Sequence, residues 1–390
     1  MKLAYYPGCS LEGSGIEYGM SMERTAEILG IELIELDDWN CCGATSGHST
    51  DKLLSLALPA RNLAIAEEIG LPMLAPCAAC YSRHRVAEHT VKHDEKMRET
   101  IARVIDKDIK GTSETLSILD VLANHIGVDK IAEKVTQPLL GMKAVCYYGC
   151  LLVRPVEHTG FDDPEDPQTM DVVVKALGAE ALDWAYKTEC CGASLLTSRP
   201  DVGNTMLYEV LRNAQEVGAE CIVTACPLCG MNLDMRQGAG EKVGNTKFGL
   251  PVYYITELLA LAAGESRQAV GIDRHFVEAG SYLDEVQKRA AEIKAELEAK
   301  AQAKAAAEKD IDPEVRQKKV AAMIKAFEKN PDKMAKRLID DEERAAVLLE
   351  IISVDSKKAA RLAEMMVDDS DKASKAADAF VTAELKKRDK

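Results

Sequence analysis

Ten of the twelve cysteines fall into two sets of five with the same order and nearly the same spacing. In each set a single cysteine precedes an adjacent pair, and the pair precedes a C-x-x-C element. The second cysteine of the pair and the C-x-x-C element are 35 residues apart in both sets. Grouped thiols of this kind indicate metal binding or redox chemistry. The first set is Cys9, Cys41, Cys42, Cys77 and Cys80, and the second is Cys150, Cys190, Cys191, Cys226 and Cys229.

The residues around the cysteines repeat as well. Each single cysteine follows a Tyr-Tyr element, and each adjacent pair continues into Gly-Ala, as in Cys41-Cys42-Gly43-Ala44. Only the first gap differs, at 32 residues against 40, and the surplus falls in the polar stretch 157–168, which we expect to be a surface loop. The front part of the chain is therefore an internal duplication.

Three kinds of chemistry compete for these thiols. Zinc takes four ligands, usually from C-x₂₋₄-C pairs, so five cysteines per set are one more than zinc or an ordinary four-cysteine cluster needs. Zinc remains an alternative if the fifth thiol is spare or redox-active. Disulfides fit poorly with the cytoplasmic location that we expect. The doubled spacing favours two iron–sulfur clusters, one on each set.

The elements that must position these cysteines alternate between strands and helices. Short apolar runs indicate buried strands, and longer segments have helical periodicity. Such alternation predicts parallel sheets covered on both faces, with the cysteines on loops that follow the strands. The strands are expected at residues 3–6, 31–34, 72–75, 144–148 and 221–224, and the helices at 20–29, 51–68, 170–177 and 202–217.

The doubled motif resembles the cysteine-rich CCG domain of the B subunit of heterodisulfide reductase. The similarity lies in Tyr5-Tyr6-Pro7-Gly8-Cys9-Ser10, the Cys-Cys-Gly-Ala elements, Pro76-Cys77-Ala78-Ala79-Cys80-Tyr81 and the segment 148–155. It covers about residues 1–264. The resemblance implies two pseudo-repeated Rossmann-like α/β modules. It also implies that each set of five cysteines holds one noncubane [4Fe–4S] cluster.

The same resemblance implies a reaction and its partners. In that family the two clusters face each other across a pocket and cleave a disulfide, such as CoM-S-S-CoB, into two thiols. Electrons come from a ferredoxin-like C subunit that is fed by a flavin-containing A subunit. This chain has no G-x-G-x-x-G element of its own to bind a dinucleotide, so it is expected to depend on partners for reducing equivalents.

Two other functions remain open. The chain could be an iron–sulfur electron-relay subunit of a flavin- or quinone-linked oxidoreductase, although a relay needs only one cluster. It could also be a zinc-stabilised scaffold that assembles other subunits.

The remaining reactive side chains carry weaker signals. Cys146 and Cys221 lie inside apolar strands and are expected to be buried hydrophobic residues. His48 and His84 are weak candidates for proton transfer, and we expect His84 to lie on a solvated basic helix face. His158 has the same ambiguity, and the remaining histidines show no constellation: His89, His93, His125 and His275. No protein acid or base is assigned.

The bulk composition limits the partners. The formal net charge is −15, of which residues 1–264 carry −14, with 37 acidic against 23 basic side chains. This acidic balance argues against a nucleic-acid partner. The chain has no run of 18 apolar residues and begins without the apolar segment of a secretory signal, so we expect a cytoplasmic protein without a membrane span.

The last 126 residues contain no cysteine and are rich in charge. Composition places the domains at 1–140 and 141–264, followed by a long charged helix or linker at 265–312 and short helices at 313–390. Asp341, Asp355 and Asp369 recur every 14 residues as expected N-caps of short amphipathic helices. This repeat weakly resembles the helical N-terminal domain of MgtE-type magnesium transporters in shape. We expect an all-α extension that either docks another subunit or stabilises the chain.

Overall fold

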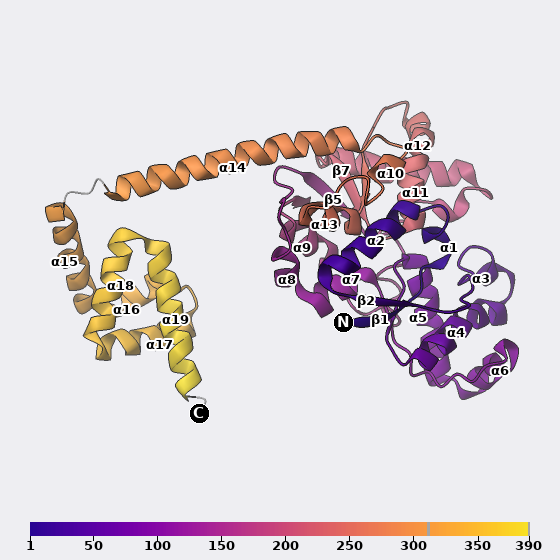
Figure 1. Cartoon of the computed structure of the whole chain (residues 1–390), viewed down its shortest axis with the longest axis horizontal. Coiled ribbons are helices and arrows are strands. Elements are labelled where there is room, and N and C mark those ends of the chain that lie inside the picture. The colour runs from indigo at the N-terminus through magenta and orange to yellow at the C-terminus, as the bar shows by residue number, and fades with distance from the viewer. Residues whose placement is uncertain (310–312, 389–390) are drawn as a thin grey trace. The chain divides into compact units, whose positions relative to one another are not determined.

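The computed structural model describes residues 1–309 and 313–388. The chain divides into two compact units, Met1–Ile293 and Lys294–Lys390. Figure 1 shows the strands gathered in the first unit, whereas the second consists of helices.

The first unit contains two four-stranded parallel sheets with the same strand order, β2-β1-β3-β4 and β6-β5-β7-β8. This repetition confirms the predicted pair of α/β modules. The first sheet consists of β1 (Lys2–Tyr5), β2 (Glu32–Glu35), β3 (Met73–Leu74) and β4 (Thr115–Leu116), and the second of β5 (Lys143–Tyr147), β6 (Glu180–Leu182), β7 (Cys221–Thr224) and β8 (Val252–Tyr254).

Helices follow the strands in both modules. The first module carries α1 (Gly8–Leu11), α2 (Ile16–Leu29), α3 (Gly47–Thr50), α4 (Lys52–Ile69), α5 (Ala78–His93), α6 (Glu95–Ile105) and α7 (Ile118–Asp120). A π-helical stretch at Val121–Gly127 and α8 (Val128–Ala132) lead into the second module. That module carries α9 (Thr169–Ala176), α10 (Pro200–Glu216), α11 (Pro227–Met235), α12 (Gln237–Gly244) and α13 (Ile255–Ala263), with 3₁₀ turns at Ala193–Leu195 and Ile272–Arg274.

One hydrophobic core runs through both modules. It extends from Leu3 to Val286 and includes the central strands of both sheets. Residues 265–293, which composition grouped with the charged helix, also pack here, because Leu283 and Val286 on α14 (Gly280–Lys309) are buried in the same core. The two cysteine sets are therefore held by a single packed body.

The C-terminal unit is built from α15 (Pro313–Lys329), α16 (Pro331–Leu338), α17 (Glu342–Val354), α18 (Ser356–Asp368) and α19 (Ser370–Arg388). Asp341, Asp355 and Asp369 accept backbone N–H groups at the starts of three successive helices, which confirms the predicted N-caps. Leu348 and Leu362 are fully buried in the core of this unit. The 14-residue repeat thus encodes a small helical bundle with its own core.

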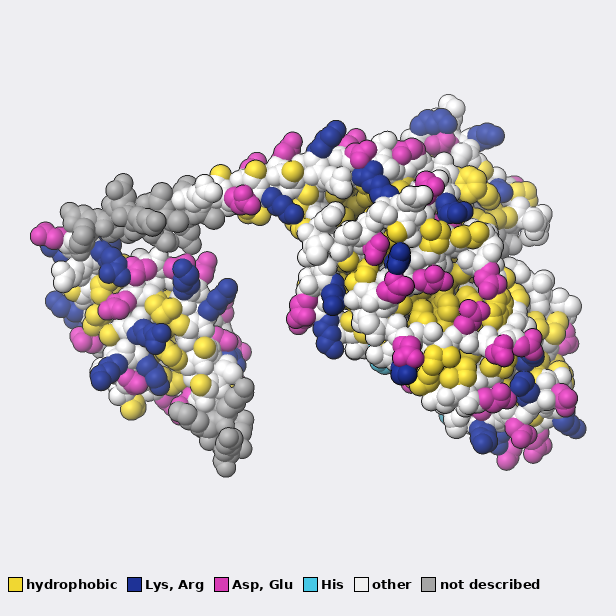
Figure 2. All heavy atoms as spheres, viewed as in Figure 1, with side chains coloured by type: hydrophobic (Ala, Val, Ile, Leu, Met, Phe, Trp, Pro, Cys, Tyr) yellow, Lys and Arg dark blue, Asp and Glu magenta, His cyan; other side chains and the backbone are white. Residues whose placement is uncertain are grey.

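The visible surfaces of the two units differ in character (Figure 2). Hydrophobic side chains form a broad yellow area on the first unit, with acidic side chains around and within it. On the C-terminal unit, charged side chains of both signs alternate with smaller apolar groups. A contiguous apolar area of this kind is typical of surfaces that other molecules cover.

Candidate functional site

The first cysteine set lies on the loops that follow β1, β2 and β3. Cys9 is on α1, the adjacent pair follows β2, and Cys77 is the N-cap of α5. The Sγ atoms of Cys9 and Cys41 are 3.8 Å apart, and those of Cys42 and Cys80 are 3.3 Å apart. Further thiol contacts link Cys41 to Cys42 and Cys77 to Cys80. All five predicted residues therefore form one connected group.

The second set occupies the corresponding loops after β5, β6 and β7, and Cys226 is the N-cap of α11. The Sγ atoms of Cys191 and Cys229 are 3.7 Å apart. Cys150 and Cys190 lie close enough to shift each other's pKa, and so do Cys226 and Cys229. The second set thus repeats the arrangement of the first set on the corresponding loops of the second module.

The two sets meet at their C-x-x-C elements. The thiols of Cys77 and Cys226 lie close enough to interact across the boundary between the modules, and this interaction raises the pKa of Cys77 and helps to lower that of Cys226. Both residues are buried and both open a helix. The ten cysteines therefore converge on the module junction, although 149 positions separate Cys77 from Cys226 in the sequence.

Neighbouring thiols favour the thiolate form at selected positions. Interactions with the thiols of Cys41 and Cys80 lower the pKa of Cys42 to about 3. A hydrogen bond from Cys150 lowers the pKa of Cys190 to about 6. Because a thiolate is the form that binds metal, each set contains a preformed anionic ligand.

Glycines let the backbone approach these sulfur atoms closely. Gly8 and Gly149 both have positive φ angles, of 68° and 70°. A Cβ added to Gly8 would lie 3.4 Å from the sulfur of Cys80, and one added to Gly149 would lie 3.1 Å from that of Cys229. A side chain at either position would occupy the space beside a candidate ligand.

A matching pair of tyrosines supports the two sets. Tyr6 donates from its hydroxyl to the carbonyl of Asn40 at 3.0 Å, and Tyr147 donates to that of Glu189 at 2.5 Å. Each acceptor immediately precedes an adjacent cysteine pair. No role was predicted for these tyrosines from the sequence, although they recur in both motifs, and that recurrence was the signal that could have identified them.

The donor set fits the iron–sulfur cofactor that the resemblance implies. Each set offers five thiols, space beside glycine, and at least one residue poised as thiolate. Within residues 1–309 and 313–388, no three His, Cys, Asp or Glu side chains are arranged to hold a single metal ion. The prediction that Cys146 and Cys221 are buried hydrophobic residues is confirmed, because both are fully buried.

His84 lies beneath the first set and is not on a solvated face, so that expectation is wrong. Its side chain is fully buried, with Nδ1 2.8 Å from the carbonyl oxygen of Cys80 and Nε2 3.2 Å from Asn62 Nδ2. Because a carbonyl can only accept, Nδ1 carries the hydrogen and Nε2 accepts from Asn62. Burial lowers the pKa of His84 and keeps the imidazole neutral. His48, by contrast, is exposed on α3.

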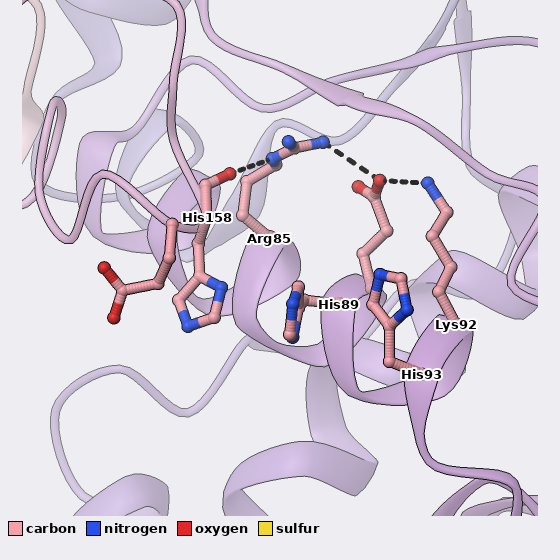
Figure 3. Close-up of a pocket in the computed structure, with 7 residues that line it drawn as sticks. Arg85, His89, Lys92, His93 and His158 are labelled. Atoms are coloured by element: carbon pink, nitrogen blue, oxygen red, sulfur yellow. Dashed lines mark hydrogen bonds and ion pairs between the residues drawn. The ribbon is translucent and has the colours of Figure 1, made fainter.

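His89 and His93, for which no site was expected, and the ambiguous His158 line one cavity of about 150 Å³ (Figure 3). The ring of His89 lies 4.5 Å from that of His93 and 4.8 Å from that of His158. Arg85 donates to the carbonyl of His158 and pairs with Glu88 at the rim. The first two histidines come from α5 and the third from the second module, so sequence spacing could not bring them together.

His275 occupies a buried ion cluster at the second module. Its Nε2 lies 2.9 Å from Glu257 and its Nδ1 lies 3.1 Å from Asp234 on α11. These two carboxylates, against the opposing effect of burial, raise the pKa of His275 to about 10. The imidazolium therefore ties the segment after α13 to the helix that carries Cys229.

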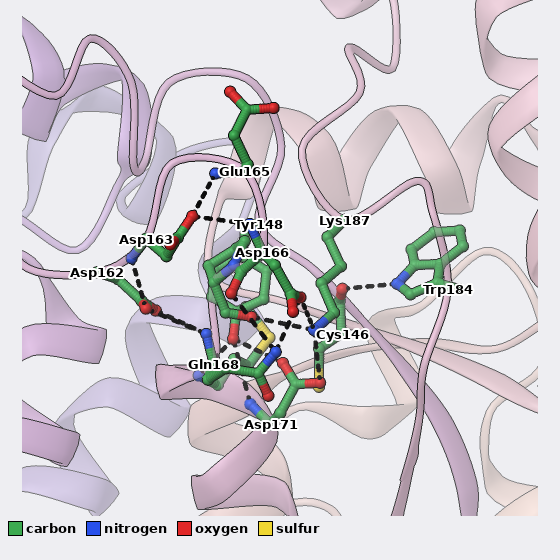
Figure 4. Close-up of polar contacts among 12 residues, drawn as sticks. Cys146, Tyr148, Asp162, Asp163, Glu165, Asp166, Gln168, Asp171, Trp184 and Lys187 are labelled. Carbon is green, nitrogen blue, oxygen red and sulfur yellow. Dashed lines mark hydrogen bonds and ion pairs between the residues drawn. The ribbon is translucent and has the colours of Figure 1, made fainter.

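A buried lysine supports the loop of the second set (Figure 4). The ammonium of Lys187 lies 2.8 Å from Asp166 and 3.2 Å from Asp171, and Tyr148 donates to the other oxygen of Asp171. The backbone N–H groups of Tyr148 and Gly149 donate to the carbonyl of Lys187. This network joins the loop of Cys150 to the segment that precedes the Cys190 pair.

Comparison with known proteins matches both modules to one family. The model of the CCG cysteine-rich domain matches residues 3–83 and 144–234. A relative from Wolinella succinogenes, named the membrane anchor subunit of 8-methylmenaquinol:fumarate reductase, is 34% identical over 71% of this chain and 98% of its own length. The B subunit of a ferredoxin:CoB-CoM heterodisulfide reductase from Methanosarcina mazei is 31% identical over 74% and 98%.

Two further matches are more distant. A probable glycolate oxidase iron–sulfur subunit from Bacillus subtilis is 23% identical over 67% of this chain and 55% of the relative. The crystal structure of a hypothetical protein from Helicobacter pylori matches with a TM-score of 0.57 at 13% identity, over 71% of this chain and about half, 52%, of that chain. In the part of the chain that the structure describes, no helix is long and apolar enough to cross a membrane. The relatives at 30% identity and above, of which this chain covers nearly the whole length, show that the chain belongs to the family of proteins with two CCG domains that resemble the B subunit of heterodisulfide reductase.

Proposed function

We propose that this chain is the disulfide-reducing subunit of a heterodisulfide-reductase-type complex. One noncubane [4Fe–4S] cluster would be held by each set of five cysteines. When bound, the two clusters would supply the electrons and the iron sites for sulfur. The balanced reaction is R–S–S–R′ + 2 e⁻ + 2 H⁺ → R–SH + R′–SH, in which the S–S bond breaks and each sulfur gains one proton.

The observation that carries this proposal is the meeting of two complete cysteine sets at one junction. A disulfide has two sulfur atoms and accepts two electrons, so a matched pair of metal sites, one for each sulfur, suits it. The contact between Cys77 and Cys226 brings the two sets together inside one core. Tyr6 and Tyr147 hold the adjacent pairs in the same way on both sides.

The exposure of the cysteines suggests that the substrate reaches the site from the side of the first module. Cys9 and Cys41 are exposed, Cys150 and Cys190 are partly buried, and the other ligands are buried. His48, the exposed candidate, lies on α3 after the first pair, whereas the buried His84 is satisfied by two hydrogen bonds. We therefore assign His84 a supporting role and leave proton transfer to groups at the surface or on the substrate.

The proposal includes partners that supply electrons. These would be a ferredoxin-like C subunit and, behind it, a flavin-containing A subunit. Several relatives are named as subunits of heterodisulfide reductases, and one is named as a subunit of a fumarate reductase. The broad apolar area on the first unit, with acidic side chains around it, offers a surface for such a partner (Figure 2).

A second candidate function is electron relay to a flavin or quinone site elsewhere. The names of two relatives favour it, the fumarate reductase membrane anchor subunit and the glycolate oxidase iron–sulfur subunit. A relay needs only one cluster, so two full cysteine sets favour the reductase.

Metal analysis of anaerobically purified protein separates these functions. The reductase predicts about eight irons per chain, an EPR signal altered by added thiols, and cleavage of CoM-S-S-CoB or another disulfide by reduced viologen dye. About four irons, or a signal that is indifferent to thiols, would favour the relay. Zinc without iron would contradict both redox functions and support the scaffold.

A further inference from the structure

Tyr18 on α2 touches both C-x-x-C loops at once. Its hydroxyl lies 3.2 Å from the carbonyl oxygen of Pro76 and 3.2 Å from that of Ala225. Each carbonyl belongs to the residue directly before the first cysteine of a C-x-x-C element, Cys77 or Cys226. The side chain is fully buried. One phenol therefore connects the two loops at the place where the cysteine sets meet.

The ring of Tyr18 is fixed by a second tyrosine. It stacks on Tyr254 with a centroid distance of 4.3 Å and an angle of 10° between the rings. Tyr254 in turn lies so close to α11 that a Cβ added to Gly230 would be 2.4 Å from its hydroxyl. Gly230 directly follows Cys229. The stacked rings therefore pack directly against α11, which contains Cys229 and has Cys226 as its N-cap.

The helix that carries Tyr18 belongs to the first module but is fastened to the second. The hydroxyls of Ser21 and Thr256 are 2.7 Å apart, and Thr25 donates to the carbonyl of Thr256 at 3.1 Å. These groups are fully buried, so their hydrogen bonds are not exchanged for water. Thr256 lies on α13. These hydrogen bonds therefore anchor α2 to α13 across the junction and hold the Tyr18 hydroxyl in its position between the two C-x-x-C loops.

A phenol hydroxyl has a single hydrogen, which two carbonyls must share here. This sharing keeps two backbone oxygens close together that would otherwise repel each other in a buried environment. We infer that Tyr18 is a positioning residue that sets the separation of the two C-x-x-C loops. It thereby determines whether one substrate disulfide, with an S–S bond of about 2.05 Å, reaches both clusters at once.

This inference rests on the proposed function, because the loops position clusters only if clusters are bound. A change of about 1 Å in the placement of reacting groups costs on the order of 100-fold in rate. Loss of the shared hydrogen bond should therefore lower disulfide cleavage, which needs both clusters together, and leave one-electron reduction of each cluster unchanged.

The test compares Tyr18→Phe with Tyr253→Phe in the full chain. Both substitutions remove one buried phenol hydroxyl that donates to the backbone, but only the first removes the bond to the cysteine loops, because Tyr253 donates to the carbonyl of Ala279. For Tyr18→Phe we expect full iron content, unchanged reduction by dithionite as followed by EPR, and CoM-S-S-CoB cleavage lower by on the order of 10- to 100-fold. Tyr253→Phe should keep both activities. Equal cleavage by Tyr18→Phe and wild type, or a parallel loss in both variants, would overturn the inference.

A metal-free readout keeps this inference distinct from the proposed function. If the wild-type chain binds no iron, the proposed function fails and the spacing of the loops is still measurable. Crystal structures of the metal-free Tyr18→Phe and Tyr253→Phe chains would give the distance between the Sγ atoms of Cys77 and Cys226. A longer distance in Tyr18→Phe than in Tyr253→Phe would support the positioning role, and equal distances would overturn it.

Discussion

The first and second modules hold their cysteines on the same loops of the same sheet, yet different side chains lie beneath those loops. Under the first set, neutral amide and imidazole groups of Asn62 and His84 make the hydrogen bonds. Under the second set, Asn232 donates to the carbonyl of Cys191, and ion pairs are added: Lys187 with Asp166 and Asp171, and His275 with its two carboxylates. Duplication preserved the sulfur geometry, while the second side adds these ion pairs to its neutral hydrogen bonds.

This difference has an electrostatic meaning. A neutral hydrogen-bond network changes little with salt or pH, whereas buried ion pairs depend on the protonation of each member. The first set is also the more exposed of the two, because Cys9 and Cys41 reach the surface. We expect the two clusters to differ in potential and in sensitivity to their surroundings, even though their ligand sets are identical.

The largest expected effect comes from removing one ligand in either module. Cys77→Ser and Cys226→Ser should each lower the iron content to about half, because each variant retains one complete set. Cys221→Ala, which removes a buried cysteine outside both sets, should leave iron and sulfide unchanged. Loss of all iron from a single variant would show that the two sets do not bind independently.

The next effect tests the ionic support of the second module. Lys187→Met leaves two carboxylates without their buried cation, which costs on the order of 3–5 kcal/mol. Asp38 occupies the equivalent place, three residues before the pair, but its side chain is 83% exposed in its pair with Arg61. Asp38→Asn should therefore cost about 1 kcal/mol or less. Chemical unfolding and iron content measure both, and equal losses would erase the distinction between the modules.

Glycine substitutions compare the space beside the sulfur atoms. Gly149→Ala should cost about 1–2 kcal/mol for its left-handed backbone and should also displace the sulfur of Cys229. Gly8→Ala meets the ring of Tyr6 first and should disturb its set less. Gly30→Ala is the matched control, with φ of 66° and no atom within 4 Å of the new Cβ. Thermal unfolding gives the backbone cost, and iron loss beyond that of the control gives the effect on the site.

The smallest effect is a difference in the sign of pH dependence. His84 has a pKa lowered by burial, so its contribution to stability is present above the unfolded value of 6.5 and is lost as pH falls. His275 has a pKa raised to about 10, so its contribution is complete below 6.5 and is lost as pH rises through 10. The raised pKa of the buried Glu257 acts in the same direction as His275.

The free energy of unfolding of the metal-free protein, measured between pH 5 and 10 for wild type, His84→Gln and His275→Gln, tests the direction of each pH dependence. One proton contributes a slope of about 1.4 kcal/mol per pH unit. The first variant should flatten the acid limb and the second the alkaline limb. A change in the opposite limb for either variant would contradict the assignment of one neutral and one charged histidine.

Much of the fold could be predicted from the repeated spacings in the sequence. The 35-residue interval and the strand–helix alternation predicted two parallel α/β modules, and the spacing of Asp341, Asp355 and Asp369 predicted three helix starts. Both signals are local, because they depend on residues within one element or on identical copies of it. The identity of the cysteine ligands stays a prediction until metal is measured.

What the sequence did not predict depends on contacts between distant elements. His89 and His158 come from different modules, and His275 meets its carboxylates only after the segment beyond α13 folds back. Tyr18 has no counterpart in the repeat, since Thr159 stands nine residues after Cys150 where Tyr18 stands nine after Cys9. Unique side chains that bind across a junction leave no periodic signal.

The fastening of α2 to α13 imposes an order of events during synthesis. Ser21 and Thr25 leave the ribosome long before Thr256, their buried partner, which is 235 and 231 residues further along the chain. At about 5–20 residues per second, those hydroxyls wait roughly 12–47 s for it. During that interval the first cysteine set has its own strands but not its final neighbour. A delivery system that acts on the nascent chain would therefore find the first cysteine set before the second set has joined it.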